Sequence, residues 1–130
     1  MIFEPPCTAL LDLSTCGRIL EAAKDAGHYA IGVDLNQDND QPGSVLTSMV
    51  KRVDTACYMT VQSVVDGSFQ GGSTAYLTVA DGGVSLTDFS VIKEALGDQF
   101  PQEILDKVQE LSDKITSGEI VVENYDGFGP

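Results

Sequence analysis

The sequence predicts an α/β fold, because a short amphipathic helix is followed directly by a brief apolar strand. The helix extends from Gly17 to Gly27, which ends it. Its apolar face is formed by Ile19, Leu20, Ala22, Ala23 and Ala26. Residues 29–34, YAIGVD, are mostly apolar and bounded by turn-forming residues, as in a buried parallel strand. Helices cover the faces of parallel sheets, so the pair indicates α/β layering.

The middle of the chain predicts a loop and then a long helix. Residues 36–43, NQDNDQPG, are too polar for anything but a loop. A helix is expected from near Ser44 to Val64, because apolar residues recur there every three or four positions. These are Val45, Met49, Val53, Ala56, Cys57, Thr60, Val61 and Val64. On this stripe, Cys57 is interpreted as a small buried hydrophobic residue rather than a catalytic thiol.

The second half of the chain predicts further strands and one more helix. Residues 73–80, STAYLTVA, and residues 84–86 flank a tight turn and could pair as a hairpin. A helix is expected to start at Pro101, which suits the first helical position, and to stop before Gly118. Residues 119–122 could form an edge strand.

Charge and composition exclude two classes of function. The chain has 130 residues, with 7 Lys and Arg against 20 Asp and Glu, for a formal net charge of −13. This charge repels phosphate backbones, so nucleic acid is not expected as a partner. No apolar run approaches the roughly 20 residues that a bilayer-spanning helix needs. The sequence therefore predicts neither a nucleic-acid-binding nor a transmembrane protein.

Residues for catalysis or metal binding are scarce. His28 is the only histidine, and it is expected at the surface, so a His-based triad or a multi-histidine metal site cannot be assembled. Residues 34–38 resemble the start of a calcium loop, but Asn39 stands where that loop needs glycine. A disulfide between Cys7 and Cys16 remains open. No enzyme activity, cofactor or metal is expected.

One geometric feature points to a ligand site. In α/β sheets, ligands bind at the carboxyl ends of the strands, where Asp34 stands. A carboxylate there can accept hydrogen bonds from both hydroxyls of a vicinal diol such as that of ribose. Lys51, about two turns into the predicted helix, could donate to the same oxygens. The alternative is that Asp34 caps the loop and Lys51 is solvated.

Several stretches, in this order and spacing, resemble a known family. They are YAIGVDLNQ, PGSVLTSMVKRVDTACY, FQGG, VADGGVSL and PQEILDKVQELSDKITSGEIVV. Together they are similar to the C-terminal part of the basic membrane protein family, the substrate-binding proteins of ABC transporters, whose best-known type is the purine nucleoside receptor. The resemblance covers residues 19–122, leaving residues 1–18 as an irregular or diverged opening and residues 123–130 as a tail.

The resemblance implies a two-lobed receptor of the periplasmic-binding-protein type I fold, which closes over a nucleoside and delivers it to a permease. This chain would hold part of the C-terminal lobe and one helix of the first lobe, near residues 50–65. Asp34 would bind ribose hydroxyls, and Lys51 would contribute near the hinge. Gly17 would end a glycine-rich loop whose backbone approaches the ligand. In this family the protein is a lipoprotein at the cell surface or in the periplasm.

The chain also departs from the family pattern. Most of the first lobe, with the aromatic residues that stack on the base, has no counterpart here, and VDLNQ replaces VDSDQ. No signal peptide is recognised in the sequence. Three interpretations follow: a fragment of an exported nucleoside receptor, a small cytoplasmic ligand-binding or regulatory domain that self-associates, and, more remotely, a nucleoside-processing enzyme. A missing lobe or a second copy would then cover the exposed face.

Overall fold

The structure is a computed structural model that describes residues 2–3 and 13–123, with side chains described from residue 17 onward. The chain divides into two compact units, Met1–Phe100 and Pro101–Pro130. The first unit holds the sheet, three α-helices and a 3₁₀ turn, and the second holds a single described helix.

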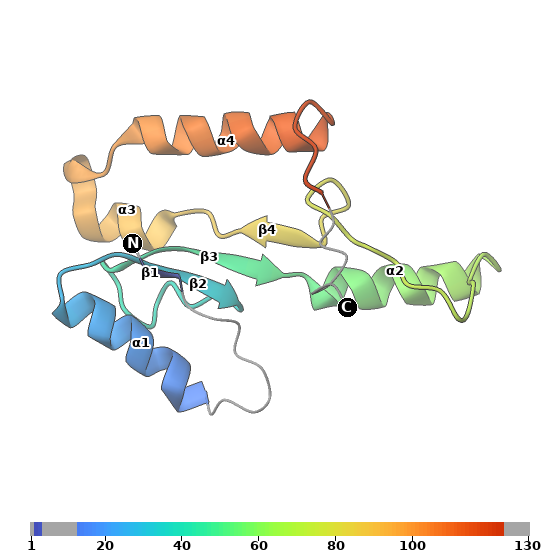
Figure 1. Cartoon of the computed structure of the whole chain (residues 1–130), viewed down its shortest axis with the longest axis horizontal. Coiled ribbons are helices and arrows are strands. Elements are labelled where there is room, and N and C mark those ends of the chain that lie inside the picture. Colours follow the sequence, from blue (N-terminus) through green and yellow to red (C-terminus); the bar gives the residue numbers. More distant parts are fainter. Residues whose placement is uncertain (1, 4–12, 124–130) are drawn as a thin grey trace, which may run out of the picture. The chain divides into compact units, whose positions relative to one another are not determined.

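The first unit is built on a four-stranded mixed sheet (Figure 1). Its strands are β1 (Ile2–Phe3), β2 (Ala30–Asp34), β3 (Val45–Lys51) and β4 (Val84–Leu86), and they lie side by side in sequence order. The first three strands are parallel, and β4 pairs antiparallel with β3. Residues 35–44 alone connect the parallel strands β2 and β3. Parallel strands are usually joined by a crossover of about a dozen or more residues that contains a helix. This connection is shorter and contains no helix.

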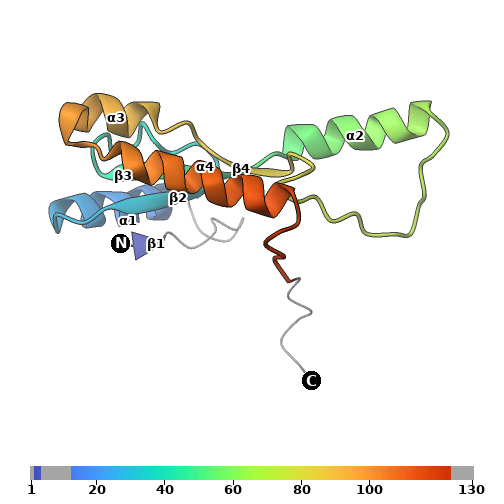
Figure 2. The same cartoon turned by 90° about the horizontal axis from the view of Figure 1, so that it is seen from above.

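Two helices pack on the sheet. Helix α1 (Leu13–Asp25) lies along β2 and α3 (Ser90–Leu96) along β3, on either side of the strands in Figure 1; in Figure 2, α1 lies behind β2. A 3₁₀ turn (Gly97–Gln99) follows α3. The core cluster joins α1 to β2 and β3, and every member has no exposed surface. It consists of Leu20, Ala23, Ala30 and Val45.

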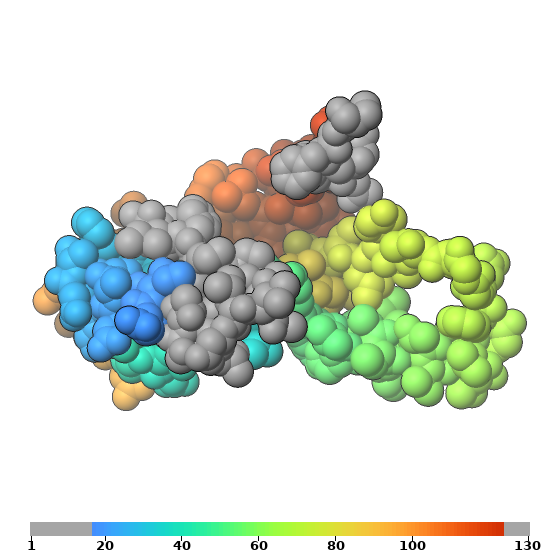
Figure 3. Space-filling model, turned by 60° about the horizontal axis from the view of Figure 1, so that its bottom comes forward, coloured from blue at the N-terminus to red at the C-terminus, as the bar shows by residue number. Residues whose placement is uncertain are grey.

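Helix α2 (Val53–Val65) differs from the others, because none of its residues is buried. Its large apolar side chains are exposed. They include Val53, Tyr58, Met59, Val61, Val64 and Val65. In Figure 3, open space separates much of this helix (green) from the segment that follows it (yellow-green).

The second unit contains helix α4 (Gln102–Thr116). It is amphipathic, and its apolar residues are half-buried or exposed. They are Ile104, Leu105, Val108, Leu111 and Ile115. The helix ends with Ser117 and Gly118, whose amides donate to the carbonyls of Asp113 and Ile115. This end matches the stop predicted at Gly118.

The α/β class and several elements are confirmed. The first helix, the strand ending at Asp34, the strand at 84–86 and the helix after Pro101 all form. The helix predicted from Ser44 is wrong in its first half, because residues 45–51 form β3. Helices α1 and α3 lie on either side of the sheet, so β3 lacks the in–out alternation of a strand with one solvent-facing side. Its apolar residues therefore imitated a helical spacing.

Other predicted strands do not form. The described residues 73–80 contain no strand, so the predicted hairpin is wrong, and β4 pairs with β3 instead. Residues 119–122 are not a strand either. The opening is more regular than predicted, with strand pairing at residues 2–3 and α1 beginning at Leu13. Helix α3 was not predicted.

Candidate functional site

Asp34 and Lys51 are brought together by the parallel pairing of β2 and β3. Each is the last residue of its strand, and Asp34 is in register with Val50. Carboxyl ends of neighbouring parallel strands meet at one edge of a sheet, so the two side chains converge. Lys51 Nζ lies 2.6 Å from Asp34 Oδ1. The structure thus places both predicted residues together, although Lys51 ends a strand rather than lying two turns into a helix.

The Asp34 carboxylate is held in an unusual state. Its Oδ1 atom is buried and is paired with the Lys51 ammonium, although this contact lacks the angles of a regular hydrogen bond. The Asp34 side chain is 23% exposed, and that of Lys51 is 54% exposed. Because the Lys51 side chain is largely exposed, it can turn aside, and a ligand hydroxyl can then donate to the carboxylate.

An open cavity of about 590 Å³ lies at this edge of the sheet. It is lined by Asp34, Leu35, Val50, Lys51, Arg52, Val53 and Asp54. Apolar side chains and charged groups of both signs therefore meet in one concave surface. Such a combination suits a small ligand that has both an apolar face and hydroxyl groups.

A second ion pair lies on the same wall. Arg52 Nη2 lies 2.8 Å from Asp54 Oδ2, and Arg52 Nε donates to Oδ1 at 3.0 Å. The hydrogen bonds from Arg52, with a further one from the Thr55 amide, lower the pKa of Asp54 to about 2. The pKa of Arg52 is raised by the same pairing. Because Asp54 is already satisfied, it competes poorly with Asp34 for ligand hydroxyls.

A buried polar cluster, which was not predicted, joins the loop after Asp34 to β3. Gln37 Oε1 accepts a hydrogen bond from the Val33 amide at 2.9 Å. The Gln37 amide donates to Ser48 Oγ at 3.0 Å, and Ser48 Oγ in turn donates to Asp38 Oδ1. These residues lay in a segment classed as polar loop and in a predicted helix. Only the strand assignment of residues 45–51 would have revealed that Ser48 faces the loop.

The other candidate site residues that the structure describes lie outside the cavity. Gly17 lies within α1 and does not line the cavity. Cys57 is a free, exposed cysteine, so its predicted burial is wrong, because α2 has no buried face. His28 is exposed, as predicted. Among residues 2–3 and 13–123, no group of three or more His, Cys, Asp or Glu is arranged to hold a metal ion. Cys7 lies outside the described residues, so the disulfide stays a prediction.

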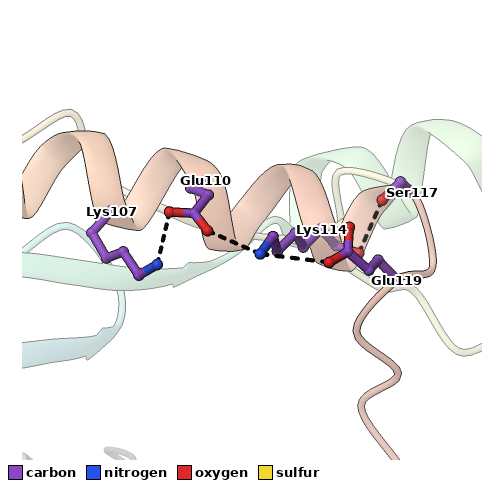
Figure 4. Close-up of polar contacts among 5 residues, drawn as sticks. All are labelled: Lys107, Glu110, Lys114, Ser117 and Glu119. Carbon is purple, nitrogen blue, oxygen red and sulfur yellow. Dashed lines mark hydrogen bonds and ion pairs between the residues drawn. The ribbon is translucent and has the colours of Figure 1, made fainter.

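The second unit carries a separate row of charges along α4 (Figure 4). Glu110 pairs with Lys107 at 2.7 Å and with Lys114 at 2.9 Å, and Lys114 also reaches Glu119 at 3.5 Å. The hydrogen bond from Lys107, followed by that from Lys114, lowers the pKa of Glu110 to about 2. These are exposed pairs of alternating sign, typical of a solvated helix face rather than a binding site.

Comparison with known proteins identifies the family. The family model for PnrA-like ABC transporter substrate-binding proteins matches residues 14–126. The chain belongs to this family. Its match confirms the resemblance to the substrate-binding proteins of ABC transporters.

Individual relatives agree. The chain is 35% identical over 117 residues to basic membrane protein D of Borreliella burgdorferi, covering 85% of this chain and 33% of that protein. It is 32% identical over 117 residues to an uncharacterized lipoprotein of Pyrococcus abyssi, covering 71% of this chain and 29% of that protein. The chain thus spans about a third of the length of these relatives.

Solved structures show the same partial correspondence. An ABC transporter solute-binding protein of Aeropyrum pernix matches 85% of this chain and 37% of its own, with 25% identity and a TM-score of 0.63. A transcriptional activator of the comK gene from Bacillus halodurans matches 80% and 34%, with 26% identity and a TM-score of 0.66. The likeness agrees with a partial periplasmic-binding-protein fold. None of the described helices has the length and apolar character needed to cross a bilayer.

Proposed function

We propose that this chain forms one wall of a nucleoside-binding site in an ABC transporter substrate-binding protein. The observation that carries the proposal is the position of the Asp34 carboxylate and the Lys51 ammonium, 2.6 Å apart, in the lining of one open cavity. Vicinal ribose hydroxyls can donate to a carboxylate placed in this way. In the proposed site, Asp34 accepts one hydrogen bond from each of the two ribose hydroxyls.

Lys51 has a second role in the proposed site. Its ammonium lies 2.6 Å from Asp34 Oδ1 and balances the carboxylate charge in the absence of a ligand. With three donors and an exposed side chain, it can turn to a ribose oxygen while it still neutralises Asp34. The exposed apolar residues Leu35 and Val53 offer contact to the flat face of the ligand.

The second wall of the site comes from outside this chain in the proposal. The cavity is open, and a ligand site normally buries about 70–90% of its ligand. Because the chain spans about a third of its relatives, the facing wall and the contacts that read the base belong to the remaining part of such a protein. The proposal includes nucleoside delivery to a permease and a place at the cell surface or in the periplasm; the family, and relatives named as membrane proteins and lipoproteins, support it.

Because one wall alone should bind weakly, the test titrates the ¹⁵N-labelled 130-residue chain with millimolar inosine, 2′-deoxyinosine and 2′,3′-dideoxyinosine, followed by NMR. Inosine should shift the amides of residues 34–36 and 50–54, and the dideoxy compound should bind more weakly. Asp34→Asn should raise the dissociation constant for inosine by roughly tenfold or more, equivalent to about 1.5–3 kcal/mol for charge-assisted hydrogen bonds.

Asp54→Asn is the matched control, because Asp54 lines the same cavity but is already paired with Arg52. It should change the affinity little. Equal affinity for inosine and its dideoxy analogue, or an unchanged constant in Asp34→Asn, would remove Asp34 from a ribose site.

A regulatory domain is the second candidate function. It is favoured by the likeness to the transcriptional activator from Bacillus halodurans. The net charge of −13 opposes direct contact with DNA by this chain, so regulation would act through ligand binding or through another protein. Both candidates use the same ligand site, and only the partner differs.

A further inference from the structure

The backbone at Asp34 adopts a conformation that an aspartate rarely takes alone. Its φ angle is 76°, in the left-handed region. Residues held in sparsely populated backbone regions persist only where the surrounding structure fixes them. The contacts of the residues next to Asp34 should therefore show what holds it.

Gln37 is the residue that closes the chain around Asp34. Its side-chain oxygen accepts from the amide of Val33, the residue directly before Asp34, at 2.9 Å. The backbone amide of Gln37 donates to Ser48 Oγ on β3 at 3.0 Å. Residues 34–36 thus form a short arch between two hydrogen bonds of Gln37, one to the Val33 amide and one to Ser48 on β3.

The tie is buried and tightly packed. Gln37 is 8% exposed, Asp38 2% and Ser48 0%. A side-chain Cβ at Gly32 would lie 2.6 Å from Ser48 Oγ and 3.0 Å from Gln37 Oε1. Glycine at position 32 therefore leaves room for the side-chain amide of Gln37 to lie against β2, beside Ser48. None of these residues lines the cavity, so the cluster does not itself meet the ligand.

We infer that Gln37 is a positioning residue for Asp34: by accepting the Val33 amide and anchoring to Ser48, it fixes the arch that presents the Asp34 carboxylate to the cavity. The inferred effect on ligand binding rests on the proposed function, whereas the effect on the backbone does not. The structure of the arch and the affinity for ligand can therefore be tested separately.

The first experiment needs no ligand. Gln37→Met keeps the size of the side chain but removes the acceptor oxygen. Residual dipolar couplings of residues 33–35 should change, and the Val33 amide should exchange with solvent about fivefold to tenfold faster, as expected for loss of one hydrogen bond. Gln41→Met is the control, because Gln41 lies in the same loop and its side-chain oxygen accepts from the exposed Lys24. It should leave both readings unchanged.

A second variant guards against general unfolding. Gln37→Glu keeps an acceptor oxygen, so it should retain the couplings of residues 33–35 even if its added charge lowers the melting temperature. Circular dichroism reports whether each variant is folded. Unchanged couplings in a folded Gln37→Met, or altered couplings in a folded Gln37→Glu, overturn the inference.

The second experiment is a double-mutant cycle with inosine. Gln37→Met should weaken binding about fivefold to tenfold in the wild-type background and less than about twofold in the Asp34→Asn background, since a positioning residue acts through Asp34. An equal loss in both backgrounds would mean that Gln37 acts only on general stability and would overturn the role. If the wild-type chain binds no nucleoside, the proposed function fails, and the dipolar couplings still decide whether Gln37 positions Asp34.

Discussion

Strand β3 and helix α2 are neighbours in sequence, separated only by Arg52, yet their surroundings are opposite. In β3, Val45 and Ser48 have no exposed surface, and the strand is paired on both sides. In α2, no residue is buried, although the helix is as rich in valine. Burial thus does not follow from apolar content along this stretch.

The difference shows which parts of the chain are stabilised by contacts within the chain itself. The first half of β3 is closed within the chain, since Val45 is fully buried and the hydrogen bonds of Ser48 are buried as well. Helix α2 leaves Tyr58 and Val61 largely exposed, at 70% and 63%. An amphipathic or apolar helix normally gains its stability from packing, so α2 contributes little to the stability of this chain.

The largest expected effect is in the core. Val45→Ala should lower the free energy of unfolding by about 2–3 kcal/mol, because two buried methyl groups are lost and a cavity remains. Val61→Ala in α2 makes the same chemical change at an exposed position and should cost less than about 0.5 kcal/mol. Urea denaturation measures both. Similar losses at the two positions would mean that α2 is packed against something in solution.

A smaller effect is expected from the polar contacts. Ser48→Ala leaves the Gln37 amide and Asp38 Oδ1 without their partner, and it should cost about 1–2 kcal/mol. Ser63→Ala in α2 removes only an exposed hydrogen bond to the Thr60 carbonyl and should be nearly neutral. The comparison uses the same denaturation assay. A neutral Ser48→Ala would show that solvent reaches the cluster and that β3 is less closed than the structure indicates.

The fold could be predicted where local pattern and burial agree. The helix before Gly27 and the strand ending at Asp34 were predicted because one buried face or one buried run marks them in the sequence. β3 was not, because a strand covered on both faces loses its alternation, and the spacing of Val45 and Met49 then fits a helix as well. The strand predicted at 73–80 failed for the opposite reason, since its apolar residues have no neighbouring strand to pair with among the described residues.

The candidate site was predicted in part. The rule that ligands bind at the carboxyl ends of parallel strands selected Asp34, and Lys51 was chosen as its partner for a helical geometry that does not exist. The two meet because both end parallel strands, a relation visible only from the register. Gln37 and Ser48 could not be found, because a buried polar cluster has the same composition as a solvated loop.

The smallest expected effect tests the junction between β3 and α2. Arg52 lowers the pKa of Asp54 to about 2, chiefly through its hydrogen bonds. A depressed pKa stabilises the folded state above the ordinary value of 3.8, and this contribution is lost as the pH falls through about 2. Arg52→Gln should move the Asp54 midpoint, followed by ¹³C NMR of its carboxyl carbon, upward toward 3.8, whereas Arg18→Gln should not.

Because the pair is exposed, about 0.5 M salt should weaken the coulombic part of the shift in the native protein. A midpoint insensitive to both Arg52→Gln and salt would show that Asp54 is held by other groups, and that the start of α2 is covered like the strand before it.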